Sequence, residues 1–266
     1  MNSRGIAPQG SDASWIKRLL GGVVSFPDSY TDAMGTSNRV LRLGWLIAAL
    51  AAATLLVGHY SNFFLLPRAH ETLNANSERT PFTWASVVAA GVAATAAILQ
   101  TDLRASRRRW LVLLAGLLAF LSLDDLIKVH ENLGGLVERA LGLSDLWVAL
   151  IWPLLYLPLM AVTVILLVVL GRSCWMPINK TLQVAIVLLG LAVVLEAATW
   201  PWSTTDNLVH IIEGGVEEAA EMAGWILIAV SMTASGIFDL LAPGAGRTHE
   251  QPVLDQQSTN ISDQTV

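Results

Sequence analysis

The chain has 266 residues, of which 54% are hydrophobic and only 14% are charged. An ordinary soluble domain carries roughly 25% charged residues, so this composition argues against a soluble enzyme or a disordered protein. A single cysteine, Cys174, excludes an internal disulfide and a metal site built from cysteines. The formal charge of −5 gives no reason to expect nucleic acid as a partner. The composition therefore predicts a multi-pass membrane protein.

Six segments are expected to cross the membrane as helices, which makes the predicted fold an all-α polytopic bundle. A helix that crosses a hydrocarbon core of about 30 Å needs about 20 apolar residues. The third segment is apolar for only about 21 Å, from Trp110 to Leu123, so its helix is expected to continue through Asp124 and Asp125. The other spans are expected at Leu43–Leu66, Phe82–Thr101, Leu146–Leu170, Leu182–Trp200 and Met222–Phe238.

The bundle is expected to occupy residues 40–242, between a cytoplasmic N-terminal segment (residues 1–39) and a disordered cytoplasmic tail (residues 243–266). Within the first segment, Trp15–Leu20 is typical either of a short amphipathic stretch on the inner leaflet or of a partly ordered tail. Twelve of the 16 Lys and Arg residues fall on one side of the predicted spans and four on the other. Because cytoplasmic loops are enriched in Lys and Arg, both termini are expected in the cytoplasm.

Acidic residues gather at the outer side of three predicted spans. Charged groups at membrane depth usually face the interior of a bundle and carry function, because exposing them to lipid costs a few kcal/mol each or more. The alternative interpretation is a set of solvated helix ends, where acids near an N-terminus are favoured by the helix dipole. The residues concerned are Asp124, Asp125 and Glu131 in the third span, Glu196 in the fifth, and Glu213, Glu217, Glu218 and Glu221 before the sixth.

Helical periodicity places several of these acids on shared faces. At about 100° per residue, Glu213, Glu217 and Glu221 lie within about 80° of arc, whereas Glu218 is expected to point elsewhere. His210 joins this face if the helix begins early enough. Gly224 continues the same face and leaves room for a close neighbour. We therefore expect this face to oppose the acids of the third span.

Such a cluster limits the chemistry available to the protein. Several carboxylates in a low dielectric cannot all stay ionised without a counter-charge. A divalent metal ion is one solution, and protonation with relay or coordination of a transported cation is another. The candidate metal ligands are Asp124, His130, Glu131, His210, Glu213, Glu217 and Glu221. Glu196 and Asp125 are the candidates for a general base or for groups that support the ligands.

Two motifs resemble a set of uncharacterised bacterial multi-pass membrane proteins. Phe120–Asp125 (FLSLDD) followed by His130–Glu131 is similar to their FLSLDE…HE stretch, with Asp125 where the pattern has Glu. Glu217–Met222 (EEAAEM) is similar to their EE..EM element, and Glu196 matches an acid late in an intervening helix. The resemblance implies an inner-membrane bundle of six or seven helices with these acids grouped, and it implies no activity.

The leading hypothesis is a membrane protein that binds a divalent metal ion, as a hydrolase or redox enzyme acting on a lipid-like or periplasmic substrate. The sequence leaves two alternatives open. One is a cation- or proton-coupled transporter, although the inner halves of the spans offer no ionisable residues to match the outer cluster. The other is a structural or accessory subunit whose acids bind a partner. Membrane lipids are the expected surroundings in each case.

Overall fold

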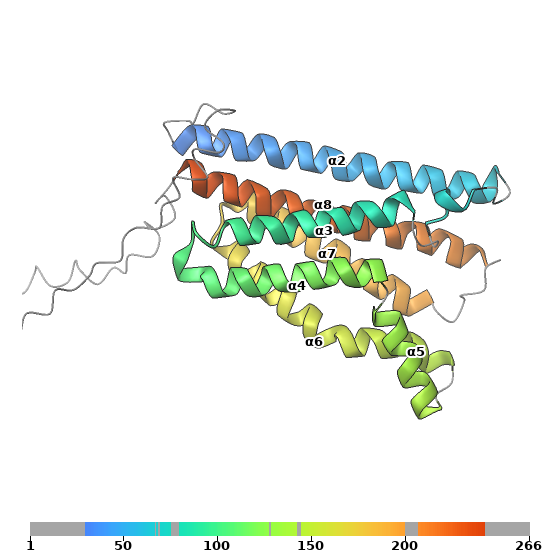
Figure 1. Cartoon of the computed structure of the whole chain (residues 1–266). Helices are drawn as coiled ribbons and strands as arrows, with labels where there is room; N and C mark the ends of the chain where they lie inside the picture. Colours follow the sequence, from blue (N-terminus) through green and yellow to red (C-terminus); the bar gives the residue numbers. More distant parts are fainter. Residues whose placement is uncertain are drawn as a thin grey trace, which may run out of the picture.

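The computed structural model describes residues 30–66, 68, 70–75, 80–127, 129–142, 145–199 and 207–242. The predicted segment Trp15–Leu20 and the predicted tail lie outside these residues. Every element of the described part is helical (Figure 1). In chain order the elements are α2 (Tyr30–Phe64), η1 (Glu71–Leu73), α3 (Pro81–Leu99), η2 (Ala105–Arg107), α4 (Arg108–Ile127), α5 (Val129–Leu141), α6 (Asp145–Arg172), α7 (Met176–Thr199) and α8 (Leu208–Leu241).

Six of the described helices (α2, α3, α4, α6, α7 and α8) are long and apolar enough to cross a membrane. The predicted all-α fold with six spans is therefore confirmed. The prediction for the third span holds for Asp124 and Asp125, because α4 continues through both and ends at Ile127. It is wrong for Glu131, which belongs to the separate helix α5. The run of apolar residues alone would have stopped this helix one turn too early.

Three features of the helices differ from the sequence prediction. The first spanning helix begins at Tyr30, well before the apolar run that marks it. The last begins at Leu208, well before its apolar run, and so includes His210 as well as the acids that the prediction already placed on this helix. The short helix α5 has no counterpart among the predicted elements. The cause is common to all three, since an apolar run marks only the part of a helix that lipid can surround.

The starts of α3 and α8 are set by capping side chains. Thr80 precedes α3, and its Oγ1 accepts a hydrogen bond from the backbone N–H of Thr83 at 3.3 Å, with Pro81 in the first turn. Asn207 precedes α8, and its Oδ1 accepts from the backbone N–H of Val209 at 2.9 Å. Each cap satisfies a backbone donor that the first turn of a helix leaves without an intrahelical partner.

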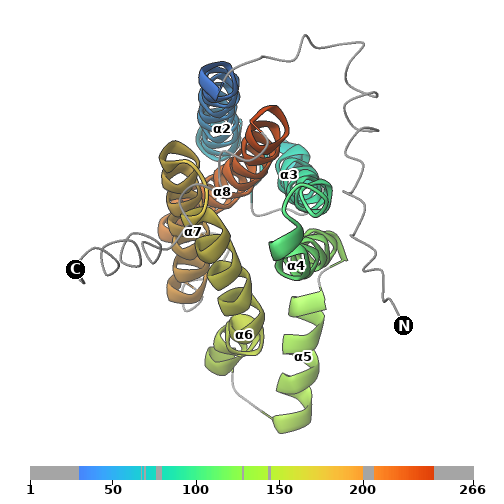
Figure 2. The same ribbon diagram turned by 90° about the vertical axis from the view of Figure 1, so that its left-hand side faces the viewer.

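Helix α8 lies at the centre of the bundle, packed against α2, α3 and α7 (Figure 2). Small residues permit the close approach. A Cβ at Gly224 would lie 2.8 Å from Cγ of Leu189 in α7, and one at Gly44 in α2 would overlap the side chain of Val230. The expectation that Gly224 makes room for a neighbour is thus confirmed. On α3 the buried face is mostly alanine: Ala89, Ala90, Ala93, Ala94 and Ala97.

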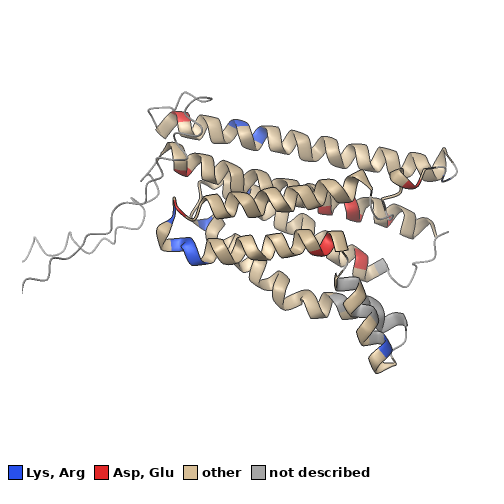
Figure 3. Cartoon of the chain, in the orientation of Figure 1, with Lys and Arg blue, Asp and Glu red and all other residues tan. Residues whose placement is uncertain are grey.

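Most of the described Lys and Arg residues lie toward one end of the bundle and most of the described Asp and Glu residues toward the other (Figure 3). The end that holds the start of α2 and the α3–α4 and α6–α7 connections is called the basic end. Its basic residues are Arg39, Arg42, Arg104, Arg107, Arg108, Arg109, Arg172 and Lys180. The opposite end, which holds the start of α8 and the end of α4, is the acidic end. This separation follows the predicted one, and the side of the membrane that each end faces stays a prediction.

Arg104 closes the basic end by joining the α3–α4 connection to α8. Its guanidinium forms an ion pair with Asp239 and donates to Oγ of Ser235 at 2.8 Å. Burial lowers the pKa of Arg104, but the neighbouring Cys174 and Asp239 together raise this pKa by more than burial lowers it. The net pKa of Arg104 therefore lies above its usual range. Arg104 therefore stays charged and holds the ends of the two helices together.

Candidate functional site

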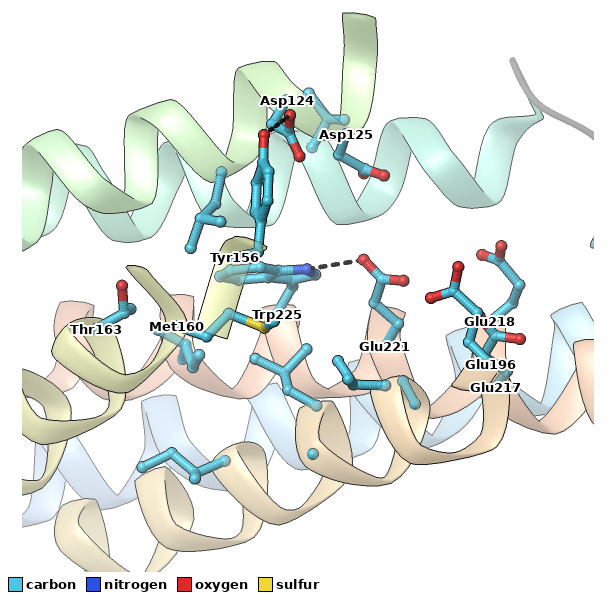
Figure 4. A pocket seen from close by; sticks show the side chains of 18 of the residues that line it. Asp124, Asp125, Tyr156, Met160, Thr163, Glu196, Glu217, Glu218, Glu221 and Trp225 are labelled. Carbon is cyan, nitrogen blue, oxygen red and sulfur yellow. Dashed lines mark hydrogen bonds between the residues drawn. The ribbon is translucent and has the colours of Figure 1, made fainter. Parts of the chain in front are cut away.

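A cavity of about 760 Å³ opens at the acidic end, between α3, α4, α6, α7 and α8 (Figure 4). Its walls toward the basic end are apolar, with Leu167 from α6, Ile186 from α7 and Ile228 from α8 among the lining residues. Polar side chains line the half nearest the acidic end. The cavity thus has an apolar part and a polar part, which is the usual pattern of a site for a small organic molecule.

Six carboxyl groups line the polar half, from three different helices. They are Asp124 and Asp125 of α4, Glu196 of α7, and Glu217, Glu218 and Glu221 of α8. Among the described residues that line the cavity there is no Lys, Arg or His. The acids of α4 face those of α7 and α8 across the cavity (Figure 4). The polar half is therefore built to attract positive charge.

Two aromatic side chains hold carboxyl groups of the cavity in place. The hydroxyl of Tyr156 in α6 donates to Oδ1 of Asp124 at 2.7 Å, and Asp124 is only 5% exposed. Nε1 of Trp225 donates to Oε1 of Glu221 one turn earlier on α8, at 3.1 Å. Each bond fixes the direction of a carboxyl group and presents an aromatic ring beside it (Figure 4). The two rings form part of the wall between the polar and the apolar half.

Glu213 lies one turn of α8 beyond the cavity, toward the start of the helix. It is 6% exposed, and its carboxyl oxygens accept no hydrogen bond of good geometry from the described residues. Its Oε2 lies 3.3 Å from Nδ1 of His210, and its carboxyl is close enough to Glu217 to interact with it. A carboxyl group buried without a donor costs free energy, so this position is an expensive one for the fold.

His59 ties α2 and the following loop to the start of α8. Its Nε2 donates to the carbonyl oxygen of Ile211 at 2.8 Å, and its Nδ1 accepts from the backbone N–H of Ala75 at 2.9 Å. The partners assign the proton to Nε2, since Nδ1 faces a donor. The next residue, Tyr60, donates to the carbonyl oxygen of Ile212 at 2.9 Å. Gly215 permits this contact, because a Cβ there would lie 2.9 Å from the His59 ring.

The structure brings five of the predicted site residues together around the cavity: Asp124, Asp125, Glu196, Glu217 and Glu221. Glu213 and His210 are neighbours on α8 outside it. His130 and Glu131 belong to α5, but their side chains lie outside the described residues. The roles predicted for all nine residues, as metal ligands or as bases, stay predictions.

Sequence reasoning missed three residues of the cavity. Glu218 was expected to point away from its neighbours, yet it lines the cavity because the acidic face of α8 is wider than one stripe. Trp225 follows Glu221 by four residues, and that spacing alone places them side by side on a helix. Tyr156 carries no such signal, since a tyrosine within an apolar run looks like any membrane-facing aromatic residue.

The described residues contain no group of three or more His, Cys, Asp or Glu side chains arranged to hold a metal ion. Two of the predicted ligands, His130 and Glu131, are not part of that set. The carboxyl groups around the cavity are spread over its walls, as Figure 4 shows, with separate groups on α4 and on α7 and α8.

Residues 45–235 match the family model described as a domain of unknown function (DUF8692). The matched stretch begins within α2 and ends within α8, so it contains the whole cavity and parts of all six spanning helices. No curated protein and no solved structure matches the chain.

Proposed function

Because the chain belongs to the DUF8692 family, whose function is unknown, we propose a function from the cavity itself. The protein binds an amphiphilic cation, that is, a lipid-like molecule with an amine or ammonium group. The observation that carries this proposal is the lining of the cavity, in which every charged side chain among the described residues is an acid. The apolar half takes the hydrocarbon part of the ligand.

The charge balance of the cavity is the first support for this proposal. Six carboxyl groups within one cavity repel one another, and a low dielectric strengthens the repulsion. Protons or a cation must offset this charge. An organic cation can contact acids on α4 and on α8 together, because it is wide enough to reach across the cavity.

The aromatic residues are the second support. Trp225 and Tyr156 line the cavity, and each donates a hydrogen bond to one of the acidic side chains there. The face of an aromatic ring attracts an ammonium group, more strongly where water is excluded. Rings and carboxylates together suit an alkylammonium group, which has a positive charge spread over an apolar surface.

The outer surface of the same helices supports access from the lipid phase. Trp84 of α3, Leu126 of α4 and Leu157 of α6 all line the cavity, and all three also have large exposed areas. In a spanning bundle such residues face lipid. A lipid-like ligand therefore reaches the cavity from the bilayer. The apolar lining toward the basic end, described above, offers no polar route across the membrane, which favours binding and release at the same side over transport.

A divalent metal ion is the second candidate occupant, with the ligand set given under Sequence analysis. The observation in its favour is that the carboxyl groups of Glu213 and Glu196 both lie close enough to Glu217 to interact with it. Such an ion would serve hydrolysis or redox chemistry on a lipid-like substrate. Elemental analysis of purified protein tests it, with wild type compared with a Glu217→Gln/Glu221→Gln variant. Near-stoichiometric metal in the wild type alone supports the metal, and no metal in either removes this candidate.

We also propose that the protein resides in a bacterial inner membrane, with the basic end in the cytoplasm. The support is the excess of Lys and Arg at that end, together with the resemblance of its motifs to bacterial membrane proteins. Labelling of an engineered exposed cysteine at Arg139 in intact and in broken cells tests the orientation.

Binding of tetraphenylphosphonium tests the proposed function, with tetraphenylborate as a probe of matched shape and opposite charge. The protein is reconstituted in lipid nanodiscs, and the fluorescence of its tryptophans reports binding. The wild type is expected to bind the cation and not the anion. The Glu217→Gln/Glu221→Gln variant is expected to bind the cation at least about tenfold more weakly, since two charges of the cavity are lost.

Glu71→Gln is the matched control for this experiment. Glu71 is an exposed acid of η1 at the same end of the bundle, and it does not line the cavity. Its variant loses one negative charge from the same surface and is expected to bind the cation like the wild type. Equal binding of cation and anion by the wild type would contradict the proposed function, as would equal losses in the control and in the double variant.

A further inference from the structure

The short helix α5 joins two spanning helices at the acidic end. It begins at Val129, directly after α4, and ends at Leu141, shortly before α6. Its 13 residues extend for about 20 Å, too short to cross a hydrocarbon core of about 30 Å. Figures 1 and 2 show it turning away from the main axis of the bundle, beside the start of α6. α5 therefore begins where the spanning helix α4 ends, at the acidic end of the bundle.

The sequence of α5 has two different faces. Helical periodicity places Val129, Leu133, Leu136, Val137 and Ala140 on one side. The polar residues lie outside this side, and the two with described side chains, Asn132 and Arg139, are at its edge, about 40–60° around the helix from Leu136. A short helix with a polar and an apolar face is typical of segments that lie in the plane of a membrane interface.

Within the part of the chain that the structure describes, the apolar face of α5 is only partly covered by protein. None of the described side chains of α5 is buried. Leu133 is 37% exposed, Leu136 57% and Leu141 66%. Water would contact these leucines if the helix projected into solution, which is unfavourable for apolar surface.

The exposed leucines of α5 continue the lipid-facing surface of the spanning helices. Leu126 and Ile127 in the last turn of α4 are exposed, and so are Leu154 and Leu157 in the third and fourth turns of α6. These four residues lie on either side of α5 in the chain. The bilayer that covers them extends to α5 at the same end of the bundle, so lipid is the occupant that fits the leucine face.

We propose that α5 lies in the membrane interface at the acidic end, with Leu133 and Leu136 inserted among the lipid chains and Asn132 and Arg139 directed to water and headgroups. This is an interaction surface for phospholipid, distinct from the cavity, and it does not depend on the ligand proposed for the cavity.

Site-directed spin labelling tests this placement. Cys174→Ser removes the single cysteine of the chain, and cysteines are then introduced one at a time by Leu136→Cys, Leu133→Cys, Asn132→Cys and Arg139→Cys. Each variant is labelled with a nitroxide in phosphatidylcholine–phosphatidylglycerol nanodiscs. Oxygen, which concentrates in lipid, and a water-soluble nickel chelate are the two relaxing agents. Leu157→Cys on α6 is the control for a lipid-facing position.

The labels at positions 136 and 133 are expected to be severalfold more accessible to oxygen, and severalfold less to nickel, than those at 132 and 139. Either leucine position alone carries the test if the other variant fails to fold. High nickel accessibility at both leucines would overturn the proposal, since the face would then lie in water. Protection of both from oxygen and nickel together would also overturn it, since another protein surface would then cover the face.

Discussion

The imidazole of His59 donates from Nε2 to the carbonyl oxygen of Ile211 at 2.8 Å, and this bond joins the far end of α2 to the first turn of α8. The second ring nitrogen accepts from the backbone of Ala75 at 2.9 Å. One fully buried side chain thus connects two helices and a loop at the acidic end. His59 therefore has a structural role at this end of the bundle.

Replacing His59 with phenylalanine is expected to destabilise the fold by about 1–3 kcal/mol, because the backbone N–H of Ala75 loses its acceptor in a buried place. Reversible unfolding in mixed micelles of a mild detergent and dodecyl sulfate measures the change. Tyr60→Phe is the control, since it removes only a solvent-exposed hydrogen bond to Ile212 and is expected to cost under about 1 kcal/mol. Equal losses of stability in both variants would argue against a stabilising role of the two His59 hydrogen bonds.

A methyl group at Gly224 is expected to force α7 and α8 apart. In the Gly224→Ala variant the new Cβ would lie 2.8 Å from Cγ of Leu189 and 3.2 Å from the carbonyl oxygen of Ala185. The expected cost is about 1–3 kcal/mol, since a packed interface must shift to accept the extra atom. Thermal unfolding in detergent measures it beside Gly116→Ala on α4, where nothing lies within 4 Å of the new Cβ. A lower unfolding temperature in the Gly116→Ala variant alone is the opposite of what we expect.

The bond between Tyr156 and Asp124 is expected to couple α6 to α4. Tyr156→Phe removes the donor from a carboxyl group that is almost fully buried, at a cost of about 1–3 kcal/mol. A double-mutant cycle with Asp124→Asn separates this interaction from other effects of the two substitutions. The double variant is expected to lose less stability than the two single losses added together. Strict additivity would show that the bond does not contribute.

Glu213→Gln is expected to raise stability, by about 1–2 kcal/mol at neutral pH. Both carboxyl oxygens are buried and accept no hydrogen bond of good geometry within the described part of the chain, and an amide of the same shape has no charge to desolvate. The free energy of unfolding in mixed micelles is the quantity to measure, with Glu71→Gln as a control for loss of one charge. A drop in stability would point to a cation held by Glu213, which favours the metal candidate.

Hydropathy predicted the fold well, because a lipid environment demands long apolar helices and little else resembles them. It placed α4 correctly across Asp124, since the apolar residues alone were too few to span. It could not find α5, where two glycines and several charges interrupt the apolar pattern. It could not find the early start of α2 either, because the first turns after Tyr30 are helical but polar, and hydropathy detects only apolar segments.

The candidate site was only partly predictable from the sequence. Acids inside apolar runs are rare and costly, so Asp124, Glu196 and Glu221 are marked by their surroundings. Whether such acids bind one small ion or line a wide cavity depends on distances between helices, which periodicity within one helix does not contain. Tyr156 shows the same limit, since its partner lies 32 residues away on another helix.

The central position of α8 divides the cavity into a fixed wall and a movable one. Glu217 and Glu221 belong to a helix that α2, α3 and α7 enclose, and close contacts at Gly44 and Gly224 leave it little freedom to shift. The facing wall belongs to α4 and α6, where two prolines, Pro153 and Pro158, interrupt the hydrogen bonding of α6 near Tyr156. Any widening of the cavity toward lipid must therefore come from α6 swinging outward, while the carboxylates on α8 stay in place.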